Sequence, residues 1–594
     1  MTTYRPPLSD IRFTLEHVVG LAELSQLEPF ADIDSEATFE LLEAAGGFAS
    51  DVLAPLNQIG DRQGSTLDGT SGTVGSPAGW GEAYRRFVDT GWGAMSLDPS
   101  YGGGGFPWLS GLAVQEVLSS ANLAWCLCPQ LTQGAIHLLQ TWGERELRDI
   151  FLRKMVAGEW TGTMAVSEPQ SGSYVGALKA SAVEAEDGTW RITGSKTFIT
   201  YGEHELAENI VHLVLARAPG APPGMKGISC FIVPKYLVQP DGSVGERNAV
   251  TCTAIERKLG LHGSPTCGLD FDGAVGYLIG ERHKGMRCMF TMMNLSRLGV
   301  ALSAVAVAER ACQQAQAYAG ERRQGRAFGA PAGEESPIIA YPDVRRMLLT
   351  MRSYVQAMRG LVFATAHSLD MAKHHPEEDV RARHEELVEL LTPVAKAWCT
   401  DTACEVASLA IQVHGGAGYI EDTGVAQHYR DIRGAAIYEG TNGVQGLDLI
   451  GRKLPLRAGG VVKDFLATVA ALACRLGDLD DEDLRSIAAN LGDAVEGLEA
   501  ATNWFFERGF SDPDDAMAAA GPYLRMFGLL AGGWMMARQA LAASELEGEE
   551  HRDKLLSARF YAEQLLPQAR GLLGAVTAGK VPLLALESEP SVAA

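Results

Sequence analysis

The sequence predicts a multidomain α+β protein in which a helical domain, a β domain and two further helical domains follow one another. Two observations lead to this fold class. The chain has 594 residues, which is too long for one hydrophobic core and suggests three or four domains. Its apolar residues follow a helical period at first, then an alternating strand pattern, and then a helical period again. We therefore expect domains over residues 1–160, 161–285, 286–455 and 462–585.

The first domain is predicted to be helical because apolar residues recur at helical spacing in two stretches. These residues are Phe39, Leu42, Ala45 and Phe48, followed by Leu112, Val114, Val117 and Leu118. A Gly/Ser/Thr-rich loop is expected between the two stretches, over residues 57–80. The glycine run within Tyr101–Phe106 lacks the Gly-Lys-Ser/Thr ending of a phosphate-binding loop, so it predicts a surface loop.

The second domain is predicted to consist of short strands. Residues 190–200 alternate like two strands around a turn, and residues 210–215 and 228–233 are short and rich in β-branched side chains. Because no helical pattern separates these strands, we expect a compact β-barrel or sandwich that extends to about residue 285.

The third and fourth domains are predicted from a return of the helical period. One apolar stripe comprises Leu302, Val305, Ala308, Cys312 and Ala315, and another comprises Leu555, Ala558, Ala562 and Leu565. Two further helical stretches precede residue 411. Pro455 and the pair Gly459-Gly460 indicate a hinge between the two domains.

Composition narrows the class of function. There are 50 Lys and Arg residues against 73 Asp and Glu residues, a net charge of −23, and no dense basic run, which argues against nucleic-acid binding. The ten cysteines are scattered without a CxxC pair, which favours buried free thiols over a zinc site or disulfides. The start of the chain has no apolar signal region, and no apolar run approaches the roughly 18 residues of a membrane span. We expect a soluble cytoplasmic protein that binds no membrane.

The most informative segment lies at residues 411–453. Within it Glu439 stands in the run Ile-Tyr-Glu-Gly-Thr-Asn, after an apolar stretch, which indicates a positioned base. The alternative is a surface glutamate before a helix-ending glycine. The segment resembles the C-terminal signature of the acyl-CoA dehydrogenases, and the resemblance covers residues 35–453. It implies an N-terminal helical domain, a middle β-barrel domain and a C-terminal four-helix domain, here with an extra C-terminal helical domain.

The resemblance also implies a reaction. Family members use FAD to convert an acyl-CoA into a trans-2-enoyl-CoA, so Glu439 would remove the α-proton while the β-hydride moves to flavin N5. Electrons would then pass to an electron-transferring flavoprotein. The start over residues 4–21 and the ending over residues 441–454 most resemble the large bacterial 3-methylmercaptopropionyl-CoA dehydrogenase type. That type implies a 3-(methylthio)propanoyl thioester and dimethylsulfoniopropionate degradation, with fatty acyl-CoA metabolism left open.

Cofactor-binding residues follow from the same resemblance. No strand–GxGxxG–helix unit appears, which disfavours a nicotinamide site. The positions implied to contact FAD are Met164, Val166, Ser167, Phe198, Thr200, Arg322, Gln324, Gln412, Gly415, Gly416, Thr441 and Gly443. Among these, Arg322, Gln324 and the Gln412 segment would reach the pyrophosphate of a neighbouring subunit's FAD, which implies a homodimer or homotetramer. Read singly, several of these motifs are equally well explained as a turn, a strand or a charged helix end.

The residues implied to contact substrate are Ser173, Asn294, Arg297, Tyr438 and Gly440. Arg297 has two open interpretations: it pairs with a CoA phosphate, or it anchors its helix through a buried ion pair. Four positions depart from the common family pattern, namely Tyr174 for Asp, Phe198 for Trp, Gly443 for Gln and, as a modest change, Asn294 for Asp.

No set of metal ligands accompanies His414, so we expect no metal site. The departures keep a non-catalytic CoA-binding scaffold open, and oxygen access leaves an acyl-CoA oxidase open.

Overall fold

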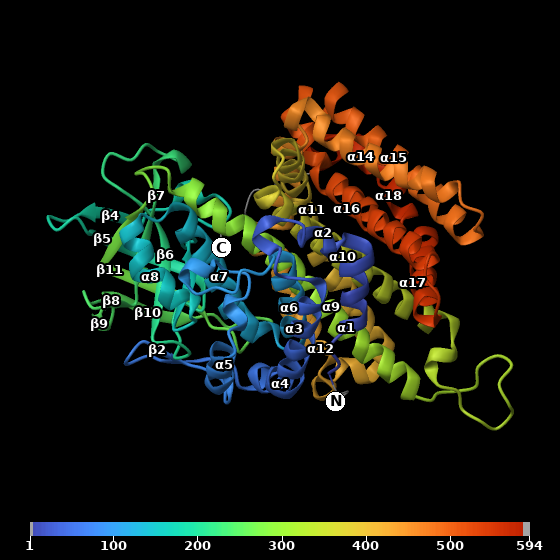
Figure 1. Cartoon of the computed structure of the whole chain (residues 1–594), viewed down its shortest axis with the longest axis horizontal. Helices are drawn as coiled ribbons and strands as arrows, with labels where there is room; N and C mark the ends of the chain where they lie inside the picture. The colour runs from blue at the N-terminus through green and yellow to red at the C-terminus, as the bar shows by residue number, and fades with distance from the viewer. Residues whose placement is uncertain (1–3, 586–594) are drawn as a thin grey trace. The chain divides into compact units, whose positions relative to one another are not determined.

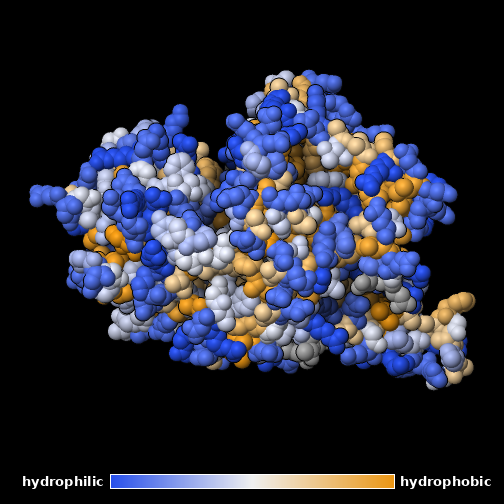
Figure 2. All heavy atoms as spheres, in the orientation of Figure 1, coloured by the Kyte–Doolittle hydropathy of each residue, from blue (hydrophilic) through white to orange (hydrophobic). Residues whose placement is uncertain are grey.

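The computed structural model describes residues 4–585 and divides into two compact units. The first, called here the mixed unit, is Asp32–Gly299 together with residues 4–6. The second, called the helical unit, joins Pro7–Ala31 to the chain from Val300 onward. Figure 1 labels the elements of both units. Figure 2 shows a mostly hydrophilic face with apolar residues scattered over it.

The mixed unit begins with helices, as the apolar spacing predicts. They are α3 (Ser35–Phe48), α4 (Ala54–Gln63), α5 (Trp80–Asp89), α6 (Trp108–Ala121), α7 (Leu123–Trp142) and α8 (Arg145–Val156). Asp34 caps α3 by accepting a 2.8 Å hydrogen bond from the backbone N–H of Ala37. Asn122 separates α6 from α7 and caps α7 through a 3.1 Å bond from the N–H of Trp125.

The expectation of a loop over residues 57–80 is wrong. Helix α4 includes residues 57–63, and β1 (Thr66–Asp68) then pairs antiparallel with β2 (Thr73–Gly75). The Gly/Ser/Thr composition belongs to the turn between these strands. Val74 in β2 is fully buried, so a single apolar residue is enough to anchor the hairpin.

The β domain forms a closed ring of strands. Its strands are β3 (Trp160–Ala165), β4 (Ser181–Glu184), β5 (Trp190–Thr200), β6 (Asn209–Arg217), β7 (Ile228–Pro234), β10 (Val250–Ile255) and β11 (Thr266–Ile279). Strands β5, β4, β6, β7 and β11 pair in succession and β11 returns to β5, while β10 and β3 flank this ring. The middle domain is therefore a barrel rather than a sandwich. A separate pair, β8 (Tyr236–Val238) with β9 (Val244–Arg247), lies outside the ring.

The ring has one narrow seam. Strands β4 and β6 pair only through Ser181 and Arg217. The guanidinium of Arg217 adds hydrogen bonds there, donating to the carbonyl oxygens of Leu178 at 2.8 Å and Gly176 at 2.6 Å. It also donates to the carbonyl oxygens of Pro222 at 3.1 Å and Gly224 at 3.0 Å.

Residues 190–200 form one continuous strand, β5, rather than two strands around a turn. Gly194 has φ of 142°, and a Cβ there would lie 2.9 Å from the Cα of Ala180, so this position in the strand requires glycine. The register between β5 and β11 shifts twice, between Cys267 and Leu269 and between Asp272 and Ala274.

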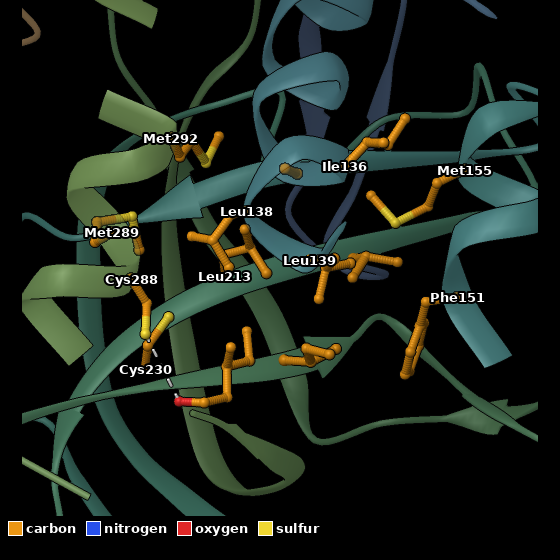
Figure 3. Packing of buried hydrophobic residues seen from close by; sticks show 14 of the residues in the cluster. Ile136, Leu138, Leu139, Phe151, Met155, Leu213, Cys230, Cys288, Met289 and Met292 are labelled. Carbon is orange, nitrogen blue, oxygen red and sulfur yellow. Dashed lines mark hydrogen bonds between the residues drawn. The ribbon is translucent and has the colours of Figure 1, made fainter. Parts of the chain in front are cut away.

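Strands of the barrel are buried on both faces. Leu213 and Leu215 of β6 pack against helices, whereas Val214 and Ala216 belong to the second hydrophobic cluster. Figure 3 shows the first cluster, where α7, α8, β6, β7 and the start of α9 (Gly285–Glu321) meet. The first cluster includes Trp160 of β3, with Met164 and Val166 packed against it, whereas Ile192 and Ile199 of β5 belong to the second cluster.

The helical unit holds the remaining helices. Its principal helices after α9 are α10 (Pro342–His374), α11 (Glu378–His414), α12 (Val425–Arg433), α13 (Asn442–Asp448), α14 (Gly460–Gly477), α15 (Glu482–Glu507), α16 (Pro513–Ser544) and α17 (Glu549–Phe560). The predicted stripe on α9 is buried along its length. Helix α16 packs on α10, α11 and α13, so the C-terminal extension shares a compact unit with the third domain.

The chain breaks its helical course at the predicted hinge. Arg457 and Ala458 have φ of 47° and 55°, between Pro455 and α14. Arg457 pairs with Glu386 and Asp464 at 2.7 Å each, which ties the break to α11 and α14.

Helix α9 corrects the expectation that no run reaches membrane length. An 18-residue window in it has a mean hydropathy of 1.4, and 67% of that window is buried inside the protein. This is the pattern of a core helix.

Candidate active site

Glu439 lies in a strained turn between the 3₁₀ helix η11 (Gly434–Ala436) and α13. Its φ is 57°, and that of Gly440 is 83°, so both residues occupy the left-handed region. Glycine accepts this conformation readily, but for a glutamate it costs about 1–3 kcal/mol and persists only where neighbouring groups impose it. The Glu439 side chain is half-buried.

Two buried side chains hold this turn from below. The ammonium of Lys396 in α11 donates a 2.8 Å hydrogen bond to the carbonyl oxygen of Gly440. The amide of Gln445 in α13 donates to the carbonyl oxygens of Glu439 at 3.1 Å and Gly440 at 3.2 Å. Both side chains are fully buried. Donors from two helices therefore converge on the peptide groups on either side of Gly440.

Asn442 links Lys396 to the carboxylate of Asp401. Its amide oxygen accepts from the ammonium of Lys396 at 2.9 Å, and its amide nitrogen donates to Asp401 at 2.7 Å. Burial raises the pKa of Asp401, against the lowering effect of the Asn442 hydrogen bond and the Lys396 charge. Thr441 caps α13 by accepting from the N–H of Val444 at 3.2 Å.

Tyr438 places an unsatisfied hydroxyl beside Glu439. Its hydroxyl oxygen is buried and has no hydrogen-bond partner among residues 4–585. Burial, followed by the negative charges of Glu439 and Asp431, raises the pKa of its phenol above the usual value. The ring packs on Gly434, where a Cβ would lie 3.2 Å from a ring carbon. Glu439 thus lies beside a largely apolar side chain, that of Tyr438, which carries one polar atom.

The residues that are predicted to bind a pyrophosphate lie in the helical unit. Arg322 donates to the side-chain oxygen of Gln324 at 3.0 Å, and Tyr341 fixes the Gln324 carbonyl through a 2.8 Å bond. Tyr318, one turn before Arg322, stacks on His414 with ring centroids 4.3 Å apart. This contact brings the end of α9 against the end of α11, where the exposed Gln412, Gly415 and Gly416 lie.

The backbone at these glycines is open. A Cβ at Gly415 or Gly416 would meet no atom within 4 Å, and Gly415 has φ of 58°. A guanidinium, an amide and open backbone suit a diphosphate. The Nδ1–H of the His414 ring donates a 2.7 Å bond to the carbonyl oxygen of Ala410, in a structural role. Within residues 4–585, no group of three or more His, Cys, Asp or Glu side chains could hold a metal ion. Gly443 is exposed at the start of α13.

In the mixed unit, the segments around Ser167 and Phe198 lie side by side. The carbonyl oxygen of Ser167 accepts from the N–H of Thr197 at 3.0 Å. Lys196 donates to the carbonyl of Val166 at 3.1 Å and pairs with Glu168 at 2.8 Å. Burial opposes ionisation of Glu168, but Lys196 and two backbone N–H groups lower its pKa overall. This buried pair holds the turn that carries Ser167.

Phe198 is exposed on this surface. Its side chain is 64% exposed and its φ is 61°, an unusual combination for a phenylalanine in a strand. Met164, Val166, Ser167 and Thr200 are half-buried around the same strand ends. An exposed aromatic ring beside backbone groups and hydroxyls suits a planar heteroaromatic ring.

The residues of this unit that are predicted to contact substrate lie on separate segments of the chain. Ser173 is exposed, and the neighbouring ring of Tyr174 lies over Gly176, where a Cβ would be 2.7 Å from it. Arg297 is 4% exposed and donates a 3.4 Å bond to the exposed Asn294 one helical turn earlier. Its burial favours the anchoring interpretation over a phosphate contact.

The structure therefore brings the predicted residues together in one group in the mixed unit and two groups in the helical unit, one of which holds Arg322, Gln324, Gln412, Gly415 and Gly416. Met164, Val166, Ser167, Phe198 and Thr200 gather in the mixed unit; Glu439, Tyr438, Gly440 and Thr441 gather in the helical unit. The residues that sequence reasoning missed are Lys396, Asn442 and Gln445. A lysine within the apolar stretch of α11 was the available signal, because buried lysines require a partner.

Comparison with known families gives four matches in chain order. The profile described as "Acyl-CoA dehydrogenase, N-terminal domain" matches residues 35–159, and the middle-domain profile matches residues 163–274. The C-terminal-domain profile matches residues 283–454. The profile "Acetyl-CoA dehydrogenase C-terminal like" matches residues 461–587.

Individual proteins are similar over almost the whole chain. A 3-methylmercaptopropionyl-CoA dehydrogenase of Ruegeria pomeroyi is 42% identical over 569 residues, covering 95% of this chain and 96% of its own. A butyryl-CoA dehydrogenase of Syntrophomonas wolfei is 33% identical over 592 residues, covering 95% of each. A solved structure of an acyl-CoA dehydrogenase complexed with FAD from Bacillus anthracis has the same fold. Its TM-score is 0.74 at 21% identity, covering 99% of this chain and 93% of its own.

Proposed function

The chain belongs to the acyl-CoA dehydrogenase family, and from that premise we propose that it converts 3-(methylthio)propanoyl-CoA into the trans-2-enoyl thioester. It is an oxidoreductase that acts on the CH–CH bond of an acyl-CoA, and its cofactor is FAD. The observation that carries the proposal is the strained Glu439 turn, held by buried donors.

We assign the α-proton to Glu439. The α-C–H of a thioester is a very weak acid, whereas a glutamate has a usual pKa of about 4.3. The site must therefore reduce the difference between the pKa of the α-C–H and that of the carboxylate. An acyl chain that covers the half-buried carboxylate expels water and raises its pKa. The backbone N–H of Glu439 would donate to the thioester oxygen, which stabilises the charge that develops there.

The described residues fit FAD. In the mixed unit, Phe198 offers an exposed ring, with Ser167 and Thr200 beside it; in the helical unit, Arg322 and the open Gly415 suit a diphosphate. Bound FAD supplies the acceptor for the β-hydride. Arg322 and Gln324 would serve the FAD of a neighbouring copy, which is why we propose a homodimer or homotetramer. Light scattering on the purified protein measures this directly.

The substrate assignment rests on similarity along the chain. The 42% identical relative is named for 3-methylmercaptopropionyl-CoA, and the 33% identical relative is named for butyryl-CoA; both acyl groups are short. The test is an anaerobic panel of 3-(methylthio)propanoyl-, butyryl-, octanoyl- and palmitoyl-CoA, followed by loss of flavin absorbance. We expect the highest kcat/KM with the first of these. A preference for palmitoyl-CoA would overturn the substrate assignment while leaving the reaction intact.

We propose an electron-transferring flavoprotein as electron acceptor and the cytoplasm as location. The competing function is an oxidase, because oxygen access depends on no single motif. Turnover with an artificial one-electron acceptor should exceed turnover with oxygen alone. Equal rates with both would favour the oxidase.

A further inference from the structure

Helix α16 of the C-terminal extension packs closely on the two helices that carry the donors of the Glu439 turn. A Cβ on Gly528 of α16 would lie 2.3 Å from Cγ of Trp398, and one on Gly532 would lie 2.6 Å from the same ring. A Cβ on Gly446 of α13 would lie 3.1 Å from the carbonyl oxygen of Ala520. Glycines therefore allow the Trp398 ring of α11 and the backbone of α13 to pack closely on α16.

These contacts are adjacent in sequence to the donors. Trp398, which covers Gly528, follows Lys396 by two residues in α11. Gly446, which abuts Ala520, directly follows Gln445 in α13. Lys396 and Gln445 are the side chains that bind the carbonyl oxygens of Glu439 and Gly440. Helix α16 thus contacts a residue next to or two positions from each donor.

We infer that the C-terminal extension positions the catalytic carboxylate, by seating the helices whose buried donors hold the Glu439 turn. The inference rests on the proposed role of Glu439 as base. A left-handed glutamate does not keep its conformation unaided, so the three hydrogen bonds from Lys396 and Gln445 must supply the constraint. A displacement of about 1 Å at a reacting group can lower a rate by about 100-fold. Lys396 and Gln445 act here as positioning residues, through Glu439.

A matched pair of variants in α16 tests the inference. Gly528→Ala introduces a methyl group against Trp398, whereas Gly521→Ala introduces the same group where nothing lies within 4 Å. Both are made in the full chain. We expect kcat of Gly528→Ala to fall about 10- to 100-fold with KM within about twofold, and Gly521→Ala to match the unmodified protein. Equal kcat for the two variants, with α16 folded in both, would overturn the inference.

Lys396→Met and Gly446→Ala cover the case in which Gly528→Ala does not fold. Lys396→Met removes the ammonium and keeps the side-chain length, and we expect the same loss of kcat at unchanged KM. Lys396→Arg keeps a charged donor and should restore part of the rate. Unchanged kcat in both Lys396→Met and Gly446→Ala would contradict the positioning role.

A second readout isolates proton abstraction from hydride transfer. Acetyl-CoA has α-protons but no β-carbon, so it can exchange its α-protons with D₂O without being oxidised. We expect exchange, measured by mass spectrometry, to fall in Gly528→Ala and Lys396→Met in parallel with kcat. Exchange at the unmodified rate in these variants overturns the inference. Absence of exchange and of turnover in the unmodified protein instead refutes the proposed function.

Discussion

Asp10 and Lys554 form an ion pair across 544 residues of sequence. Asp10 lies on α1 (Leu8–Phe13) and Lys554 on α17, and the ammonium is almost fully buried. Arg359 of α10 approaches the second oxygen of Asp10 at 3.6 Å and pairs with Glu309 of α9 at 2.8 Å. A network of four charges therefore joins both ends of the chain to the core of the helical unit.

Removing one member of this network should destabilise the helical unit. Lys554→Met leaves the Asp10 carboxylate without its nearest cation, and we expect a loss of about 3 kcal/mol in the free energy of unfolding. Lys463→Met, on an exposed position of α14, serves as the control and should cost little. Urea unfolding followed by circular dichroism measures both; equal midpoints for the two variants would contradict the prediction.

The same network predicts a pH dependence. Burial tends to raise the pKa of Asp10, but Lys554 and Arg359 outweigh it and lower the value from 3.8 to about 2. Because the folded-state pKa lies below the unfolded one, the stabilisation is complete above about pH 4 and is lost as the pH falls towards 2. It amounts to about 2 kcal/mol. The difference in unfolding free energy between the unmodified protein and Asp10→Asn should therefore shrink between pH 5 and pH 3; a constant difference would be inconsistent with it.

Glu439→Gln should retain FAD and lose dehydrogenation. The amide keeps the size of the side chain but cannot accept the α-proton, so we expect kcat to fall by about 10⁴-fold. Flavin absorbance of the purified variant checks retention, and anaerobic bleaching by substrate checks chemistry. Glu421→Gln, at an exposed glutamate that pairs with Arg430, should keep full activity. Appreciable bleaching by Glu439→Gln would remove this residue from the mechanism.

Arg322→Ala should weaken FAD retention. The guanidinium lies at an exposed position beside Gln324 and is the group best suited to hold a diphosphate there. We expect a lower ratio of flavin to protein after gel filtration, whereas Arg326→Ala, four residues further on, should leave the ratio unchanged. Normal flavin content in Arg322→Ala would count against the assignment.

Phe198→Gly should separate stability from cofactor binding. Glycine relieves the left-handed strain at this position, which is about 1 kcal/mol. The flavin-free protein should therefore unfold at an equal or higher temperature. The loss of the exposed ring should at the same time weaken FAD binding, measured by flavin fluorescence. Phe198→Trp keeps an aromatic face and should bind FAD normally. Unchanged FAD affinity in Phe198→Gly would show that the ring is not part of the site.

The order of the helical and β domains could be predicted from the sequence because it depends on local patterns, whereas the role of Glu439 as base stays a prediction from a short motif. Periodicity identified the buried stripe on α9, and a short motif identified Glu439. Lys396 and Gln445 were not predicted, since their role depends on which carbonyl groups the fold brings to them. A lysine in an apolar helix indicates only that some partner exists.

Long-range packing was the other limit. Nothing in the sequence near Asp10 indicates Lys554, and the pairing of Pro7–Ala31 with the chain from Val300 onward follows from contacts far apart in sequence. The hairpin within residues 57–80 was missed because its strands are only three residues each, too short for an alternating pattern to stand out. The strand over residues 190–200 was divided wrongly because a glycine such as Gly194 can stand within a continuous strand as well as in a turn.

The seam of the barrel determines how that domain comes apart. Elsewhere around the ring the strands share at least three pairs, but β4 and β6 share one, and the Arg217 side chain bonds only the carbonyl oxygens of Gly176 and Leu178 in the segment before β4. Thermal fluctuations that split the cylinder therefore begin there, and amide protons of β4 should exchange with deuterium before those of β5 or β11. We therefore expect the barrel to open first between β4 and β6. The pairing of residues 190–200 with β11, away from this seam, should persist longest.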